Sequence, residues 1–114
     1  MDMDSILTSV KKQLGPSALE TYFDPDIIMF INSMFLPLRQ MGIGPAEGFF
    51  IEDVSTTWDE FIPDDVVLCN AVKGYMYAKV KLAFDPPSNA SHIKCLEQII
   101  SEFEWRGTND PELS

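Results

Sequence analysis

The sequence predicts an all-α protein: a small bundle of about four helices with a long αα-hairpin near its C-terminal end and a long loop that has room for a short β-hairpin. Two observations predict this class. Apolar residues recur at intervals of three and four residues, which is the spacing of one helix face, in four separate stretches. Each stretch also begins or ends at residues typical of helix ends. With 114 residues, the chain is long enough for one domain with a single core.

The hairpin is expected to pair helices over about 64–84 and 88–106, joined by Phe84-Asp85-Pro86-Pro87-Ser88. The prolines stop the first helix because they cannot donate backbone hydrogen bonds and they disfavour helical geometry in the preceding residue. Ser88 or Asn89 then caps the second helix. A connection this short makes the two helices antiparallel neighbours. Gly74 costs about 1 kcal/mol inside a helix, so we expect another helix to approach closely there.

Two further helices precede the hairpin. The first is expected over 4–14, with Asp4 as its N-cap and Gly15-Pro16 as its stop. The second begins at Asp24-Pro25, and its apolar residues cover more than half its circumference, as in a helix that is central in a bundle or buried at a subunit contact. Pro37 removes a hydrogen bond from this second helix, so we expect a kink or an early end there.

Residues 42–63 form a long connection, and a loop of about twenty residues in a small domain is commonly functional. Within it, Phe49-Phe50-Ile51 has the composition of a short strand, and Thr57-Trp58-Asp59-Glu60 is a capping box that opens one helical turn. We expect Trp58 and Phe61 to pin the loop to the core. For Phe49 and Phe50 a core contact and a contact with another subunit both remain open, because adjacent residues rarely face the same way.

The net charge of −10 argues against nucleic-acid binding through phosphate contacts, which requires clustered Lys and Arg. No Lys or Arg occurs between Arg39 and Lys73, whereas seven acidic residues do: Glu47, Glu52, Asp53, Asp59, Glu60, Asp64 and Asp65. A solvated acidic loop is the simpler interpretation. The alternative is a patch that meets a basic surface of a partner.

No chemical motif is present, and we predict that the protein is not an enzyme and holds no cofactor or metal. One histidine cannot form a histidine-pair site, and adjacent carboxylates point apart. The cysteines, Cys69 and Cys95, would lie roughly 24 and 12 Å from the hairpin turn at about 1.5 Å per residue, so we expect buried free thiols. No apolar run approaches the roughly 20 residues of a membrane span. The acidic start lacks the basic region of a secretory signal, which indicates a cytosolic or cytosol-assembled protein.

The segment Tyr75–Pro87 together with Glu104-Trp105-Arg106 resembles the head-tail connector (head-completion adaptor) family of tailed bacteriophages. The similarity continues through Ile31-Asn32-Ser33, Leu38–Pro45 and Thr56-Thr57-Trp58, so it spans about residues 24–106. Members of this family are small helical proteins that assemble as rings, typically twelve-fold, beneath the portal.

The resemblance implies a structural virion protein of the neck that is assembled in the host cytoplasm. Its expected partners are further copies of itself in the ring, the portal protein, and the next neck, stopper or tail-completion protein. DNA would pass through the channel without specific binding, and no membrane is involved. We expect one connector domain over 1–106 and, after Gly107 as a C-cap, a flexible tail over 107–114.

The candidate interface with other subunits or the portal comprises Gly44, Pro45, Glu47, Phe49, Phe50, Glu52, Asp53, Trp105 and Arg106. Two alternative functions come from other classes. An acidic phage-encoded inhibitor that mimics DNA would space its carboxylates along one exposed face. A helical regulatory module that binds a basic host protein would be a monomer or dimer and would form no ring.

Overall fold

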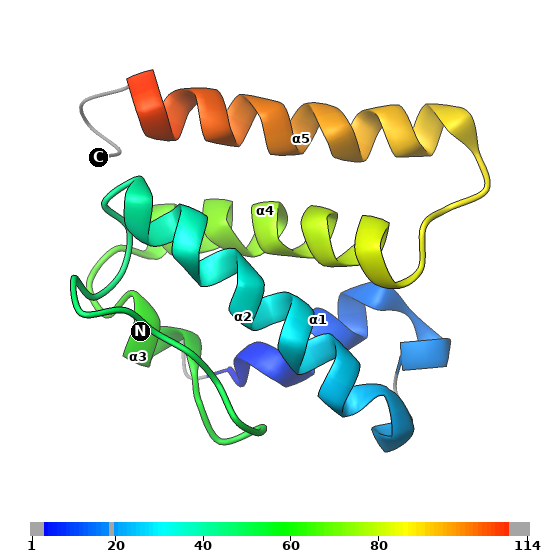
Figure 1. Ribbon diagram of the computed structural model, residues 1–114, viewed down its shortest axis with the longest axis horizontal. Helices are drawn as coiled ribbons and strands as arrows, with labels where there is room; N and C mark the ends of the chain where they lie inside the picture. The colour runs from blue at the N-terminus through cyan, green and yellow to red at the C-terminus, as the bar shows by residue number, and fades with distance from the viewer. Residues whose placement is uncertain (1–3, 19, 110–114) are drawn as a thin grey trace.

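The computed structural model describes residues 4–18 and 20–109 and confirms the all-α class (Figure 1). Its helices are α1 (Ile6–Leu14), α2 (Asp24–Gln40), α3 (Trp58–Phe61), α4 (Val66–Phe84) and α5 (Ala90–Asn109). Two short 3₁₀ turns, Pro16–Ala18 and Thr21–Phe23, join α1 to α2. None of the helices within the described part of the chain is long and apolar enough to span a membrane.

The centre of the fold is α4, which packs against α1, α2 and α5. It can do so because it is apolar on several sides: its buried residues are Cys69, Val72, Tyr75, Met76, Ala78 and Val80. The sequence predicted that α2 is either central in the bundle or buried at a subunit contact. In the fold α2 buries Ile27, Ile31 and Leu38 but leaves Met29 and Leu36 each 59% exposed.

The predicted αα-hairpin is confirmed, with α4 and α5 side by side and antiparallel (Figure 1). The carboxylate of Asp65 accepts from the N–H of Leu68 at 2.9 Å and caps α4. Asn89, one of the two residues expected to cap the second helix, accepts from the N–H of His92 at 3.1 Å. Between the helices, the rings of Tyr75 and Phe103 stack with centroids 4.4 Å apart.

The predicted N-cap of the first helix is wrong, and of the two outcomes expected at Pro37, a kink or an early end, the early end does not occur. The N-cap of α1 is Ser5, whose hydroxyl oxygen accepts from the N–H of Thr8 at 3.2 Å, whereas Asp4 precedes it. The second helix does not end early at Pro37; it continues to Gln40 as one ribbon (Figure 1). The missing hydrogen bond is tolerated because the turn around Pro37 buries Phe35 and Leu38 in the core.

All residues of the 42–57 connection are described, and they contain no strand or β-hairpin. The short strand predicted at Phe49-Phe50-Ile51 is therefore wrong. The end of the connection forms instead an isolated bridge with the start of the chain, between Ser5 and Thr57. There Ile6 N–H donates to Thr56 O and Trp58 N–H donates to Asp4 O, both at 3.0 Å. The capping box is confirmed, since Thr57 N–H donates to the Glu60 carboxylate at 2.7 Å and α3 follows.

The roles predicted for Gly74 and Gly107 are both wrong. Gly74 has no atom within 4 Å of the place where a Cβ would be, so no helix approaches it. At Gly107 an added Cβ would lie 2.1 Å from Met41 Sδ, so the end of α2 and the end of α5 meet there. Gly107 is also not a C-cap, because α5 runs on to Asn109. The rest of the predicted tail, 110–114, lies outside the described residues.

Both cysteines are free, but only Cys69 is buried as predicted, whereas Cys95 is exposed. The reason is that α5 packs through one stripe, where Leu96, Phe103 and Gly107 are buried. Cys95 lies about 100° from Leu96 around the helix and falls outside this stripe.

Candidate subunit interface

The two adjacent aromatic residues of the connection face in different directions. Phe49 packs into an aromatic cluster, with its ring centroid 5.2 Å from that of Phe35 and 4.9 Å from that of Phe61. Phe50 is 64% exposed. Phe49 therefore fastens the connection to the core, and Phe50 is the one available to a partner.

Gly44 packs against the Phe61 ring of the same aromatic cluster. Its φ of +86° is a left-handed conformation that favours glycine, and an added Cβ would lie 2.3 Å from Phe61 Cε1. The neighbouring turn is closed by Gly48 N–H donating to Pro45 O at 3.0 Å. Gly44 and Pro45 thus shape the connection that carries the exposed residues.

Asn32 of α2 places Phe50 on the surface. Its side chain accepts from Ile51 N–H at 2.8 Å and donates to Ile51 O at 3.0 Å. Met29 and Leu36 lie one turn before and one turn after Asn32 on α2, and both are exposed. We call Met29, Leu36 and Phe50 the α2 patch. Met29 and Leu36 were missed from the sequence, because α2 is apolar on more than one side and its periodicity does not say which side is exposed.

The acidic residues Glu47, Glu52 and Asp53 are exposed on the connection next to this patch. The Asp53 carboxylate accepts from the Ser55 hydroxyl and from the Ser55 N–H, the latter at 2.8 Å. These two hydrogen bonds, the hydroxyl first, hold the pKa of Asp53 below its ordinary value, so that this residue is ionised at neutral pH.

The remaining candidates, Trp105 and Arg106, lie near the end of α5. Trp105 is 64% exposed, and it points about 180° away from Leu96 on the buried stripe. Its neighbour Arg106 is exposed as well. Trp105 therefore lies on the outer side of α5, away from α4, whereas Arg106 lies about 80° from the buried stripe, on a flank of the helix.

The candidate residues lie on two different elements. Figure 1 shows α5 along one edge of the molecule and the 42–57 connection reaching to the opposite edge. The end of α2 meets the end of α5, where Met41 packs against Gly107. The structure offers two exposed surfaces, one at the α2 patch with its acidic neighbours and the other at Trp105 and Arg106.

Within the described part of the chain, no group of three or more His, Cys, Asp or Glu residues is arranged to hold a metal ion. Two carboxylates serve the fold directly: Glu60 and Asp65 accept from backbone N–H groups at the starts of α3 and α4. Their role in these two places is helix capping.

In comparison with known proteins, the family model described as "Phage connector protein" matches residues 6–112, nearly the whole chain. Neither a curated protein nor a solved structure matches the chain.

Proposed function

The chain belongs to the phage connector protein family, and on that premise we propose that it forms a ring beneath the portal in the virion neck. In this proposal the ring extends the DNA channel and docks the next neck protein. Both the family and the all-α fold agree with the resemblance seen in the sequence.

One observation carries the ring: large apolar side chains are exposed on two different elements of the same molecule. The α2 patch offers Met29, Leu36 and Phe50, and α5 offers Trp105. A contact between unlike surfaces of identical subunits closes into a ring when the rotation between them permits it. Such a contact, repeated around the axis, would cover the α2 patch of each copy with α5 of the next.

Burial and charge both support this contact. Covering a half-exposed large apolar side chain stabilises an interface by roughly 1 kcal/mol or more. Arg106 lies beside Trp105, while Glu52 and Asp53 are exposed close to the α2 patch. Opposite charges at the rim of an interface favour the correct orientation and speed association.

The overall charge suits a DNA channel. With a net charge of −10, a ring of these subunits has a negative potential, which repels phosphate and lets DNA pass without sticking. A DNA-mimicking inhibitor would need carboxylates along one exposed face. Here α1 and α4, about a quarter of the chain, contain no Asp or Glu at all.

The interface is tested by cross-linking across copies. In a Cys95→Ser background, Phe50→Cys and Trp105→Cys are combined, and the chain is oxidised in the presence of the cognate portal protein. We expect a ladder of cross-linked oligomers, because each copy offers both residues to different neighbours. The control combines Phe50→Cys with Lys94→Cys, a residue elsewhere on α5, and should give little ladder. The proposed contact would be contradicted if both pairs cross-linked to the same extent, or if the pair at 50 and 105 gave no cross-linked oligomers.

A further inference from the structure

A row of exposed side chains runs along one side of α2 and begins just before the helix. Tyr22, Met29 and Leu36 are seven residues apart, about two helical turns, so they lie on the same side. Tyr22 is 81% exposed, and Met29 and Leu36 are 59% exposed. The 3₁₀ turn Thr21–Phe23 leads directly into α2, so Tyr22 continues the row. We call these three residues the α2 row, which is about 21 Å long.

The carboxylate of Asp26 lies beside the α2 row. Asp26 is exposed, four residues after Tyr22 and three before Met29, which is the spacing of neighbours on one helix face. The nearby Asp24 is held by Lys11 Nζ at 2.6 Å, whereas Asp26 has no hydrogen-bond or ion-pair partner among the described residues. An exposed aromatic ring beside a carboxylate offers a cation both a ring face and a negative charge.

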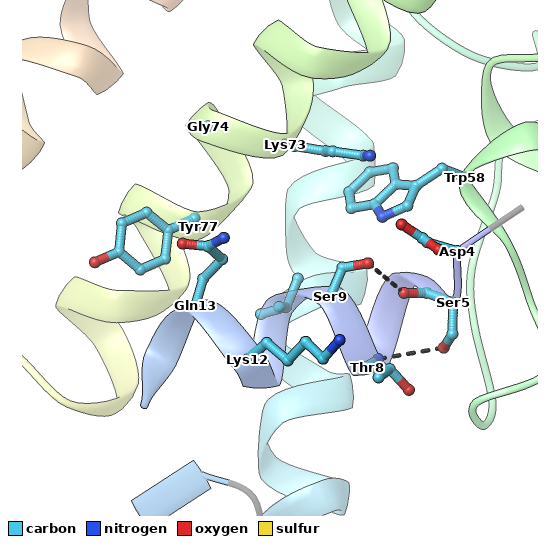
Figure 2. Close-up of a pocket in the computed structure, with 11 residues that line it drawn as sticks. Asp4, Ser5, Thr8, Ser9, Lys12, Gln13, Trp58, Lys73, Gly74 and Tyr77 are labelled. Atoms are coloured by element: carbon cyan, nitrogen blue, oxygen red, sulfur yellow. Dashed lines mark hydrogen bonds between the residues drawn. The ribbon is translucent and has the colours of Figure 1, made fainter. Parts of the chain in front are cut away.

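Most of the 8 Lys and Arg side chains are engaged within their own copy. Four bind an oxygen acceptor of the same chain: Lys11, Arg39, Lys79 and Lys81. Lys12 and Lys73 line a cavity between α1 and α4. Figure 2 shows Lys73 above the Trp58 ring in that cavity, with the Asp4 carboxylate at the edge of the ring. The two basic residues that remain are both on α5, Lys94 and Arg106.

Arg106 lies far from Asp26 of its own copy. Its neighbour Gly107 packs against Met41, so Arg106 is close to the C-terminal end of α2. Asp26 is fifteen residues before Met41, about 22 Å away along the axis of α2. Figure 1 shows the start of α2 at the opposite side of the molecule from the place where α2 and α5 end. An arginine side chain is much shorter than this distance, so the two groups can meet only between copies.

We propose that Tyr22 and Asp26 bind the guanidinium of Arg106 from a neighbouring copy, so that α5 of that copy lies against the α2 row. The planar guanidinium stacks on the Tyr22 ring and pairs with the Asp26 carboxylate. Trp105, the adjacent residue, is then close to the α2 patch. This inference rests on the proposed ring and names the residues that orient its subunit contact.

Arg106 is a better occupant than Lys94 for two reasons. It is adjacent to Trp105, and a guanidinium can stack on a ring and pair with a carboxylate at the same time, whereas an ammonium group is a point charge. The position of Arg106 also gives the contact a direction. Each copy carries the cation near the end of α2 and its acceptor near the start, and such a head-to-tail contact can repeat around an axis.

The first test is charge reversal in the full chain, assembled with the cognate portal protein. Asp26→Arg and Arg106→Asp each place like charges together, so each should raise the chain concentration for half-maximal assembly at least about 10-fold. The double variant restores opposite charges and should assemble within about 3-fold of the parent chain. Analytical ultracentrifugation measures all four proteins. Single variants that assemble like the parent, or a double variant no better than the single ones, would overturn the proposal.

Two controls make this test specific. Both reversals oppose the helix dipole, at the first turn of α2 and the last turn of α5. The double variant carries both of these effects, so recovery of its assembly cannot come from helix stability, which melting temperatures report. Glu52→Arg, at another exposed carboxylate, should not rescue Arg106→Asp. Rescue by Glu52→Arg equal to that by Asp26→Arg would overturn the assignment to Asp26.

The second test concerns the ring of Tyr22. Tyr22→Ala should weaken assembly about 3-fold or more, whereas Tyr22→Phe keeps the ring face and should stay within about 2-fold of the parent. The matched control is Val67→Ala on α4, because Val67 is also 81% exposed. This control should assemble like the parent chain. Equal effects of Tyr22→Ala and Val67→Ala would overturn the role of Tyr22.

The outcome can be separated from that of the ring. A ring that forms equally well with and without the charge reversals would remove the pair of Asp26 and Arg106 and keep the ring. A parent chain that stays monomeric with the portal would overturn both proposals. A parent chain that stops at a dimer would also overturn both, because the α2 row would then be covered by α2 of a second copy.

Discussion

The side chain of Asn32 holds the backbone of Ile51 through two hydrogen bonds, accepting from its N–H at 2.8 Å and donating to its carbonyl oxygen at 3.0 Å. The Asn32 side chain thus supplies the pair of backbone hydrogen bonds that a neighbouring strand would supply to an extended segment. Ile51 itself is 1% exposed. This pair fixes the middle of the long connection to α2 and turns the preceding residue, Phe50, outward.

The Asn32–Ile51 contact makes a first prediction. Asn32→Ala should lower the free energy of unfolding by about 1–3 kcal/mol, because it leaves two buried backbone groups without partners. Asn32→Asp keeps the acceptor for Ile51 N–H but turns a carboxylate oxygen toward Ile51 O, which repels it, so this variant should also be destabilised. Urea unfolding measures both. A change below about 0.5 kcal/mol for Asn32→Ala would show that the connection is held elsewhere.

The neighbouring aromatic residues Phe49 and Phe50 should behave differently when each is replaced by serine. Phe49→Ser removes a ring from the cluster with Phe35 and Phe61 and should cost roughly 2–4 kcal/mol of stability. Phe50→Ser changes an exposed side chain, so stability should stay within about 0.5 kcal/mol. Analytical ultracentrifugation with portal should then show weaker assembly for Phe50→Ser. Normal assembly of this variant would remove Phe50 from the interface.

Two helical glycines form a matched pair for a third prediction. Gly74→Ala meets open space and should stabilise the protein by up to about 1 kcal/mol, since alanine is the better helix former. Gly107→Ala gains the same propensity but forces Met41 aside, which costs about 1–3 kcal/mol, so a net loss is expected. Melting temperatures of the two variants should move in opposite directions. A shift of both in the same direction would contradict the close contact at Gly107.

Tyr75 gives a prediction about alkaline pH. Its hydroxyl donates to the Glu104 carboxylate at 2.8 Å, and burial, then this hydrogen bond and the carboxylate charge, raise the pKa of Tyr75 above the ordinary value of 10.0. In the unfolded chain Tyr75 loses its proton near pH 10, whereas in the folded protein it keeps it. Its contribution to stability is therefore complete below pH 10 and declines as pH rises through and beyond 10.

Tyr75→Phe should cost about 0.5–1.5 kcal/mol at pH 7, through the lost hydrogen bond. Above pH 10 the variant should lose stability less steeply than the parent chain, so the difference between them narrows. Unfolding by urea at pH 7, 10 and 11 measures this. A constant difference between the two proteins across that range would mean that Tyr75 ionises equally in both states.

The parts of the fold that the sequence predicts well are those set by local chemistry. The hairpin follows from periodic apolar residues and from Asp85-Pro86-Pro87, and α3 follows from the capping box at Thr57 and Glu60. Each signal lies within a few residues of its effect, so no knowledge of the packing is needed.

The parts that the sequence does not predict depend on residues far apart. The role of Gly107 is decided by Met41, and the strand expected at Phe49-Phe50-Ile51 is replaced by a contact with Asn32. Both α2 and α4 are apolar on more than one side, so periodicity alone does not say which is central. For the same reason the exposed Met29 and Leu36 were hidden in the pattern of α2.

The native mass of the chain, alone and mixed with the cognate portal protein, tests the central proposal most directly. Native mass spectrometry should show one closed assembly with a fixed number of copies, either in the chain alone or on the portal. The Phe50→Ser variant should shift it toward monomers. A chain that stays monomeric at all concentrations and does not bind the portal would contradict the proposed ring.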